Sequence, residues 1–417
     1  MLKRFLKTIQ WLIIIILFVL VAFIGYIYYQ FNYYNPKDTA ELNERNLGFF
    51  SDEYTESRMN FKKSADVLQI KHPNTIYRSF SVPSKIDDDL MVDYIYVPAT
   101  NDSSKILVLS SGVHGVEAYT GSAVQQMFIE EYLNEELLEN TGVFLIHSIN
   151  PYGFKYDRRV SENNVDLNRN SYYNDELYST VNAGYPLLKD FINPEDELDL
   201  NSFFHRFFFL YSVDEIRKSS IPVLRQAILQ GQYEFPDGLY YGGSDQEPQI
   251  DSLMPIISSI CKPYEEILAI DLHTGYGKKG SMHLFPNPVE EDLKSEMEDL
   301  FKGYQIDWGD SDDFYTVTGD FVNMIGQINP GKKFIPMTFE FGTMDSQTTL
   351  GSMKSLQIMV AENQGYHFGY ESQEDKDQMR NIFLEMYFPS SLTWRSHCID
   401  QSREIFEDIL PIFTQPK

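Results

Sequence analysis

The amino-acid sequence predicts an α/β fold: a mixed, mainly parallel central sheet with helices on both faces, preceded by one N-terminal transmembrane helix. Short apolar runs of strand length alternate along the chain with segments whose apolar residues recur at helical spacing, a pattern typical of a mainly parallel sheet. An uncharged run near the N-terminus predicts the transmembrane helix. With 417 residues, of which 43% are hydrophobic, the chain can bury a sizeable core.

The predicted transmembrane helix lies at residues 9–29. Its apolar part begins at Trp11 with WLIIIILFVLVAF and ends in tyrosines, which suits a helix of about 20 residues that crosses a bilayer between interfacial aromatic rings. A secretory signal peptide has a shorter apolar part and a small-residue cleavage site, which this sequence lacks. We therefore expect an uncleaved signal anchor.

The orientation of the anchor follows from three basic residues that precede it, Lys3, Arg4 and Lys7. Because basic residues stay on the cytoplasmic side, residues 1–8 are predicted to be cytoplasmic and the bulk of the chain extracytoplasmic. Residues 30–47 are polar and are interpreted as a tether. Residues 48–417 then form the predicted catalytic domain.

Within that domain, a helical pattern at 48–68 is followed by alternating strands and helices. Strands are predicted at 91–97, 105–110, 142–149, 266–272, 281–286 and 334–341. Helices are predicted at 121–133, 212–231, 289–303, 346–363 and 401–413. Ligands of such sheets bind beyond the carboxyl ends of the strands, so polar residues there are candidates for a functional site.

Charge and cysteine content narrow the classes of partner and site. A net charge of −27 repels phosphate backbones, so we expect no nucleic-acid partner. Two cysteines, Cys261 and Cys398, are too few for a disulfide framework or a thiolate zinc site. Whether they pair stays open from the sequence, and Cys261 is interpreted as a small core residue.

Two predicted strand ends carry histidines in glycine-rich loops. Residues 109–125 read LSSGVHGVEAYTGSAVQ and place His114 three residues before Glu117, and His273 ends the strand of the DLHTGYG segment. Two histidines and a carboxylate form a three-ligand zinc site with one position open for water. The alternative is that these are ordinary hydrogen-bonded polar residues at wet strand ends.

The segment 150–170 concentrates arginines in a chain with few basic residues. Arg158, Arg159 and Arg169 could hold a substrate carboxylate or a developing oxyanion. The alternative is a solvated face on which these arginines pair with Asp157, Glu162 and Asp166.

Glu340 lies inside the apolar strand of the TFEFGT segment, between Phe339 and Phe341. Strand alternation points the two rings to one side and the carboxylate to the other. Burial would raise the pKa of that carboxylate, which suits a general base that acts on water. The alternative is that Glu340 faces solvent or pairs with an arginine.

Taken in order, these motifs resemble the zinc metallocarboxypeptidase family, the carboxypeptidase A-type hydrolases. The resemblance rests on His-x-x-Glu at 114–117, Asn-Pro-Tyr-Gly at 150–153, Asp-Leu-Asn-Arg-Asn at 166–170, His273 and Glu340, and it extends from about residue 48 to near the C-terminus. Within that superfamily the chain looks closest to an uncharacterised branch near the aspartoacylase/succinylglutamate desuccinylase group. The implied fold is carboxypeptidase-like.

The resemblance implies one Zn²⁺ per chain, held by His114, Glu117 and His273. It implies that Asp166 accepts a hydrogen bond from a ligand imidazole and orients it. It also implies that Glu340 deprotonates the attacking water and then protonates the leaving nitrogen.

The resemblance further implies how substrate is held. Arg159, or alternatively Arg158, would stabilise the tetrahedral oxyanion, while Asn168 and Arg169 would bind a terminal carboxylate. The family's substrate-clamping tyrosine has no secure match here, and its candidates are Tyr240 and Tyr241. The aromatic-rich segment at about 175–250 is either a roof over the cleft or an ordinary packed insertion.

Three functions follow from these interpretations. The leading one is a membrane-anchored zinc hydrolase that cleaves a C-terminal peptide bond, and the first alternative is an aspartoacylase-like deacylase of small N-acyl amino acids. A peptide needs an open groove, whereas an N-acyl amino acid needs a closed pocket. The second alternative is a metal-free binding domain of the same fold, which would have lost a ligand or the base.

Overall fold

The computed structural model describes residues 2–101, 104–172, 174–286, 289–308 and 317–415. Its centre is one seven-stranded sheet with the order β1-β2-β4-β3-β5-β7-β6. The strands are β1 Ile76–Ser81, β2 Met91–Val97, β3 Lys105–Ser111, β4 Thr141–His147, β5 Glu266–Gly275, β6 Met282–Phe285 and β7 Lys333–Gly342. The four central strands β4, β3, β5 and β7 run parallel, and β1, β2 and β6 pair antiparallel at the two sides. The predicted mixed, mainly parallel sheet is confirmed.

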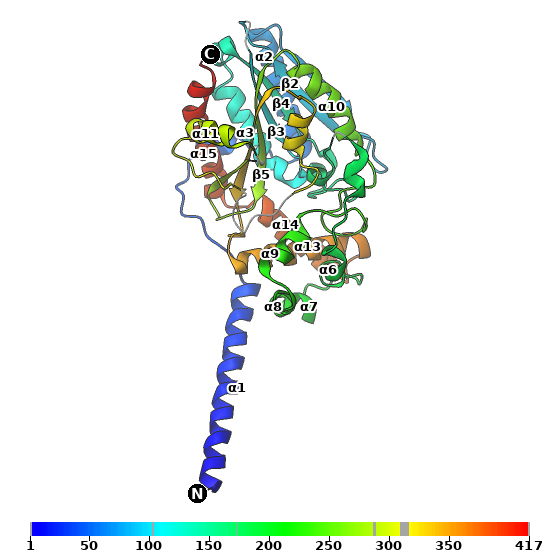
Figure 1. Ribbon diagram of the computed structural model, residues 1–417, viewed down its shortest axis with the longest axis vertical. Coiled ribbons are helices and arrows are strands. Elements are labelled where there is room, and N and C mark those ends of the chain that lie inside the picture. The colour runs from blue at the N-terminus through cyan, green and yellow to red at the C-terminus, as the bar shows by residue number, and fades with distance from the viewer. Residues whose placement is uncertain (1, 102–103, 173, 287–288, 309–316, 416–417) are drawn as a thin grey trace.

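Helices cover both faces of the sheet (Figure 1). Alternation along β3 sends Leu107 and Leu109 into one core and Ile106 and Val108 into the other, because successive side chains of a strand point to opposite faces. The first core is closed by α2 Tyr54–Lys71, α3 Ala118–Glu131, α11 Glu291–Leu300 and α15 Leu392–Phe413. The second core is closed by α10 Pro248–Cys261 and α12 Phe321–Gln327.

A third cluster of helices lies between the sheet and the N-terminal helix (Figure 1). Its members are α6 Tyr185–Ile192, α7 Phe203–Arg206, α8 Phe208–Lys218, α9 Ile221–Leu229, α13 Thr349–Phe368 and α14 Gln373–Tyr387. The short elements α4 Glu135–Asn140, α5 Pro151–Lys155, η1 Glu44–Phe49, η2 Gly115–Glu117, η3 Leu167–Arg169 and η4 Asp175–Ser179 complete the described chain.

All six predicted strands are present, but several elements differ from the prediction. The edge strand β1, and the helices α10, α12 and α14, were not predicted. The helix predicted at 212–231 is two helices, because Ser219 has non-helical angles (φ −134°, ψ −136°) and Pro222, the second residue of α9, is tolerated only in a first turn. The helix predicted at 401–413 is the second half of α15. Cys261 and Cys398 are both buried and unpaired.

The N-terminal helix α1, Leu2–Asn32, projects from the domain (Figure 1). In the part of the chain that the structure describes, it is the one helix whose length and apolar character suit a membrane crossing, a property that signal sequences share. Its last turns pack on the domain: the rings of Tyr28 and Phe207 are 5.0 Å apart, and Asn32 Nδ2 donates to the Arg206 carbonyl at 3.0 Å. The predicted tether also contacts the domain, since Asp38 accepts hydrogen bonds from Ser391 and Thr393.

Candidate metal centre

Neighbouring parallel strands bring the two loop histidines together. His114 follows β3, Glu117 ends the turn η2, and His273 lies near the end of β5. Because β3 and β5 pair in parallel register up to Ser111 and Leu272, their carboxyl ends meet at one edge of the sheet. The nitrogen or oxygen atoms that the three side chains offer lie within 4.8 Å of one another, and all three side chains are buried.

Close backbone packing fixes the loop that carries His114. Gly112 has a φ of 73°, which favours glycine, and a Cβ on Gly115 would lie 2.2 Å from the carbonyl carbon of Gly153. Gly153 belongs to the predicted Asn-Pro-Tyr-Gly turn, in which Asn150 Oδ1 accepts a hydrogen bond from the Gly153 N–H at 2.9 Å. The same Asn150 donates to the carbonyl of Arg159 at 3.1 Å. The turn thus positions both the loop that carries His114 and the segment that carries Arg159.

Each histidine lies between two carboxylates. His114 places Nε2 3.1 Å from Asp166 Oδ1 and Nδ1 2.9 Å from Glu117 Oε1. His273 places Nε2 2.6 Å from Asp271 Oδ2 and Nδ1 2.9 Å from Glu117 Oε2. Histidines that bind a metal generally donate their other ring N–H to a carboxylate or a carbonyl. Asp166 and Asp271 are placed to accept those hydrogen bonds.

The donor set fits a cation such as Zn²⁺. If the Nε2 of each ring donates to its aspartate, each neutral ring has a lone pair on Nδ1. The two Nδ1 atoms lie 3.2 Å apart, and each is 2.9 Å from one oxygen of the Glu117 carboxylate. Three acceptors in such proximity repel one another unless a positive charge lies among them. Ligand atoms in a tetrahedral zinc site lie about 2.0–2.2 Å from the metal and hence roughly 3.3 Å from one another. The observed separations are close to that value.

Without a metal, protons supply the positive charge. Burial lowers the pKa of His273, but the carboxylates of Asp271 and Glu117 outweigh burial and raise that pKa well above its usual value. The group of His114, Glu117 and His273 therefore attracts both protons and metal cations strongly.

Glu340 lies beside His273, its register partner in the neighbouring strand β7. It is partly buried, and its Oε1 accepts a hydrogen bond from the Tyr276 N–H at 2.9 Å. Desolvation, followed by the negative charge of Glu117, raises the pKa of Glu340 to about 8. A carboxyl group with this pKa exchanges protons near neutral pH.

Of the two arginines left open by the sequence, Arg159 lies beside the candidate metal ligands. Its Nη2 donates to Asp166 Oδ2 at 3.0 Å, and its Nη1 is 3.6 Å from Glu117 Oε1. Burial lowers the pKa of Arg159, but the charge of Asp166 outweighs burial and raises it well above its usual value. Its guanidinium is a fixed positive charge next to the candidate ligands.

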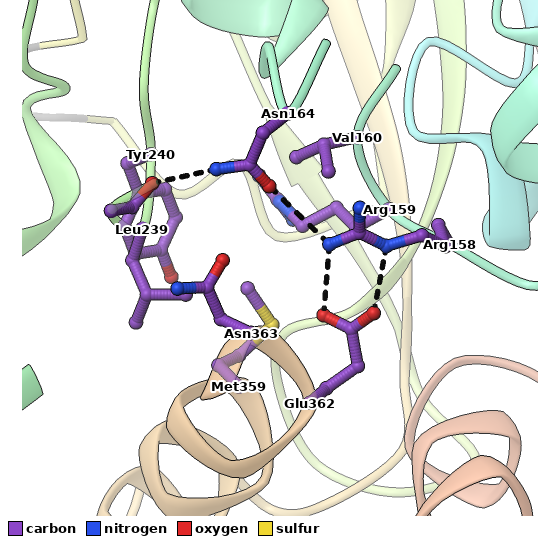
Figure 2. A pocket seen from close by; sticks show the side chains of 10 residues that line it. Arg158, Arg159, Val160, Asn164, Leu239, Tyr240, Met359, Glu362 and Asn363 are labelled. Carbon is purple, nitrogen blue, oxygen red and sulfur yellow. Dashed lines mark hydrogen bonds and ion pairs between the residues drawn. The ribbon is translucent and has the colours of Figure 1, made fainter. Parts of the chain in front are cut away.

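Arg158 points away from the candidate metal ligands into a separate network. Its Nε donates to Glu362 Oε1 at 2.8 Å, and its guanidinium carbon lies 3.3 Å from the centre of the Tyr366 ring. Figure 2 shows the Arg158–Glu362 ion pair at one side of a small cavity, with Arg159 behind it. The cavity has a volume of about 10 Å³, enough for roughly one water molecule. Its lining includes Arg158, Arg159, Tyr240, Met359, Glu362 and Asn363.

The predicted carboxylate-binding pair already holds backbone groups. Asn168 Oδ1 accepts a hydrogen bond from the Phe321 N–H at 2.9 Å. Arg169 donates to the Leu229 carbonyl at 2.6 Å through Nη2 and to the Asn168 carbonyl at 2.8 Å through Nη1. These contacts fix the orientation of both side chains.

Of the two candidate tyrosines, Tyr240 lies beside the arginines. Its ring centre is 5.3 Å from the guanidinium carbon of Arg159 and 5.6 Å from that of Arg169. Tyr241 instead packs in the core under α10 and α12, and its carbonyl accepts from the Asp166 N–H.

Two residues at the centre were missed by sequence reasoning. Asp271 lies two residues before His273 on the same strand face, and that spacing was the available signal. Tyr387, at the end of α14, packs its ring on Gly275 and donates to Met359 Sδ at 3.0 Å. Burial raises the pKa of the Tyr387 hydroxyl; the charge of Arg159 opposes this rise and the charge of Glu117 adds to it. No local sequence signal connects Tyr387 to the strand ends.

Fold and site together define an α/β protein with a buried His-Glu-His cluster at the carboxyl edge of its parallel strands. A family model described as Protein of unknown function (DUF2817) matches residues 50–401, so the chain belongs to this family. A comparison with curated proteins finds no match.

Solved structures similar to this chain include bovine thrombin-activatable fibrinolysis inhibitor, at 13% identity and a TM-score of 0.42, covering 76% of this chain and 95% of that one. Carboxypeptidase A from Helicoverpa armigera is 13% identical, with a TM-score of 0.39 and coverage of 78% and 76%. A metallo-carboxypeptidase from Burkholderia cenocepacia is 10% identical, with a TM-score of 0.39 and coverage of 75% and 70%.

Proposed function

We propose that the chain is a zinc-dependent hydrolase that cleaves a C-terminal peptide bond. The observation that carries the proposal is the juxtaposition of three kinds of group: a buried His-Glu-His cluster, a carboxyl group with a raised pKa, and a fixed guanidinium. His114, Glu117 and His273 would hold one Zn²⁺. When bound, zinc supplies a Lewis acid that makes water a competent nucleophile at neutral pH.

Glu340 acts as the general base and then as the general acid. It accepts the proton that water loses on attacking the scissile carbonyl carbon, and it passes that proton to the nitrogen of the breaking C–N bond. A pKa near 8 in the metal-free chain supports both transfers, because such a group is neither a very weak base nor a very weak acid near pH 7. The nearby positive charge of a bound metal would shift the balance toward the base form.

Arg159 donates hydrogen bonds to the carbonyl oxygen as negative charge develops there. Its fixed position against Asp166 supports this role, since a preorganised donor needs little reorientation during the reaction. Asn168 and Arg169, with the ring of Tyr240 alongside, are the proposed contacts of the terminal carboxylate. Arg158 has no such role in this proposal, because its Nε already donates to Glu362.

The proposed location is the outer face of a membrane. Residues 9–29 would be the transmembrane anchor, with residues 1–8 cytoplasmic and the domain at 48–417 extracytoplasmic. The apolar character of α1 and the basic residues before it support this arrangement.

A second candidate is the deacylation of small N-acyl amino acids, which needs a closed pocket. The cavity beside Arg159 has a volume of only about 10 Å³, room for roughly one water molecule, so it does not accommodate such a substrate. Glu340 and its partner Tyr276 lie on the solvent side of the centre, where a longer peptide could extend.

A panel of three substrate types tests the proposal on the zinc-loaded full chain. It consists of blocked dipeptides with a free C-terminal carboxylate, the same dipeptides amidated, and N-acetyl amino acids. We expect release of the C-terminal amino acid from the free dipeptides alone, with a rate that falls about 10²–10⁴-fold in Glu340→Gln. Cleavage of N-acetyl amino acids alone establishes the second candidate. If none of the three substrate types is cleaved, both candidate functions are contradicted, and the metal-free binding domain becomes the interpretation.

A further inference from the structure

Apolar side chains of α7 and α8 are exposed on the surface next to the end of α1. Phe203 is 63% exposed, Val213 52%, and Leu210 and Tyr211 39% each. We call these four residues the α7–α8 face. Exposed apolar clusters of this kind generally mark an interaction site.

The α7–α8 face is continuous with α1. The ring of Tyr28 contacts Phe207 at 5.0 Å, Phe207 contacts Phe203 at 4.5 Å, and Phe203 contacts Tyr211 at 6.5 Å between ring centres. Figure 1 shows α7 and α8 beside the domain end of α1. The α7–α8 face is therefore exposed to the same medium as the last turns of α1.

The contacts along α1 indicate how deep the α7–α8 face would lie relative to the hydrocarbon core of a membrane. A helix rises 1.5 Å per residue, so about 20 residues, here 9–29, cross a hydrocarbon core of about 30 Å. Ile24, Ile27 and Tyr28 all pack against the cluster that includes Phe208. Ile24 lies about 7.5 Å before the end of that span along the helix axis. Helices that lie in a bilayer interface bury their apolar side to a similar depth, about 5–10 Å.

We propose that the α7–α8 face docks into the lipid interface of the membrane that α1 spans. The domain is then held at two places, by the anchor and by a monotopic contact. This inference rests on the membrane anchor proposed above. The inference also concerns the orientation of the candidate metal centre. β3 begins at Lys105, whose Nζ contacts the carbonyl of Gln415 near the C-terminus. From there the strand runs toward the end of the domain at which α1 lies (Figure 1). The carboxyl edge of the parallel strands thereby faces the membrane.

The charges around the face favour a neutral lipid surface. Arg217 pairs with Asp214 at 2.9 Å and Lys218 with Glu215 at 2.6 Å, so the end of α8 has no excess of positive charge. The chain as a whole carries −27 and is repelled by anionic headgroups. The contact is therefore expected in phosphatidylcholine bilayers without anionic lipid.

Single-cysteine labelling of the full chain in phosphatidylcholine nanodiscs tests the proposal. Cys261 and Cys398 are buried, so an introduced surface cysteine is the accessible thiol. Phe203→Cys reports on the face, Phe18→Cys (74% exposed, in α1) reports on the anchor, and Ile70→Cys (82% exposed, in α2) reports on water. Each carries an environment-sensitive fluorophore, read with and without brominated acyl chains in the lipid.

The proposal expects blue-shifted emission at Phe203→Cys and quenching by brominated lipid about threefold or more above that of Ile70→Cys. Quenching at Phe18→Cys with none at Phe203→Cys overturns the docking and leaves the anchor intact. No quenching at Phe18→Cys overturns the anchor, and the docking with it. A blue shift at Phe203→Cys without quenching indicates a protein contact, such as a second copy of the chain, and overturns lipid docking.

Discussion

Two buried histidines at strand ends illustrate how surroundings set chemical character. His147 is the last residue of β4, and His273 lies near the end of β5, with β3 between the two strands. Their exposed fractions are 0% and 4%, so burial alone does not separate them. Their pKa values nevertheless move in opposite directions, to about 4 for His147 and well above the usual value for His273.

The neighbours of each ring explain the difference. His147 Nε2 lies 3.0 Å from Ser57 Oγ and 3.1 Å from Ser122 Oγ, and its ring stacks on Phe61. Burial then dominates and disfavours the charged ring. His273 lies between two carboxylates, whose negative charge outweighs the same desolvation. A buried histidine with hydroxyl partners is a neutral core residue, and one with carboxylate partners is prepared for a proton or a metal.

The largest expected effect concerns the base rather than the ligands. Glu340→Gln removes proton transfer but keeps His114, Glu117 and His273, so turnover should fall about 10²–10⁴-fold with zinc content unchanged. Steady-state kinetics on the cleaved substrate, with zinc analysis of the same preparation, measures both quantities. Turnover within a few-fold of the parent chain contradicts the role of Glu340.

His147 should make folding stability depend on pH. Its folded pKa of about 4 lies below the unfolded value of about 6.5, so between these values the unfolded chain binds more protons. Stability is therefore lost as pH falls from about 6.5 to 4, by about 3 kcal/mol from this one group. Denaturant unfolding of parent and His147→Gln at several pH values should show a shallower dependence in the variant. Equal slopes would mean that His147 is not the group responsible.

Removing the carboxylate behind His273 should weaken metal binding without abolishing it. Asp271→Asn keeps the shape but loses the charge that faces Nε2 at 2.6 Å, and zinc affinity should fall about 10–100-fold. Ser122→Ala removes a polar partner of His147 instead and should leave the affinity unchanged. Competition with a chromophoric chelator compares the two variants. An equal loss in both would remove the distinction between the two histidines.

Zinc affinity should itself rise with pH. Because Asp271 and Glu117, against the effect of burial, raise the pKa of His273 well above its usual value, the metal-free ring keeps its proton through neutral pH. Zinc must displace that proton, so affinity should increase about tenfold per pH unit up to the raised pKa. Chelator competition at pH 6 and pH 8 measures the slope. An affinity that is flat across this range contradicts a protonated His273.

Much of the site could be predicted because its residues follow strand ends. The strands leading to His114 and His273 are mainly apolar runs, and their parallel order places both histidines on one edge. The choice between Arg158 and Arg159 could not be predicted, because it depends on how Asn150 and Glu362 hold the loop. Glu362 comes from α13, far along the chain.

The elements that were missed have weak local patterns. The edge strand β1 reads IYRSFS and buries no residue fully, so its pattern lacks an apolar face. The break between α8 and α9 was missed for a different reason: the apolar residues keep helical spacing across it, although Pro222 was an available local signal. Tyr387 reaches the centre only because α14 packs beside β5, a tertiary contact that no short motif encodes.

The most direct test of the account is the zinc content of the purified full chain beside two variants, His273→Ala and His147→Gln. The account predicts close to one zinc per chain in the parent and in His147→Gln, and none in His273→Ala. Zinc retained by His273→Ala, or lost equally from both variants, or absent from the parent, would contradict a metal centre at these strand ends.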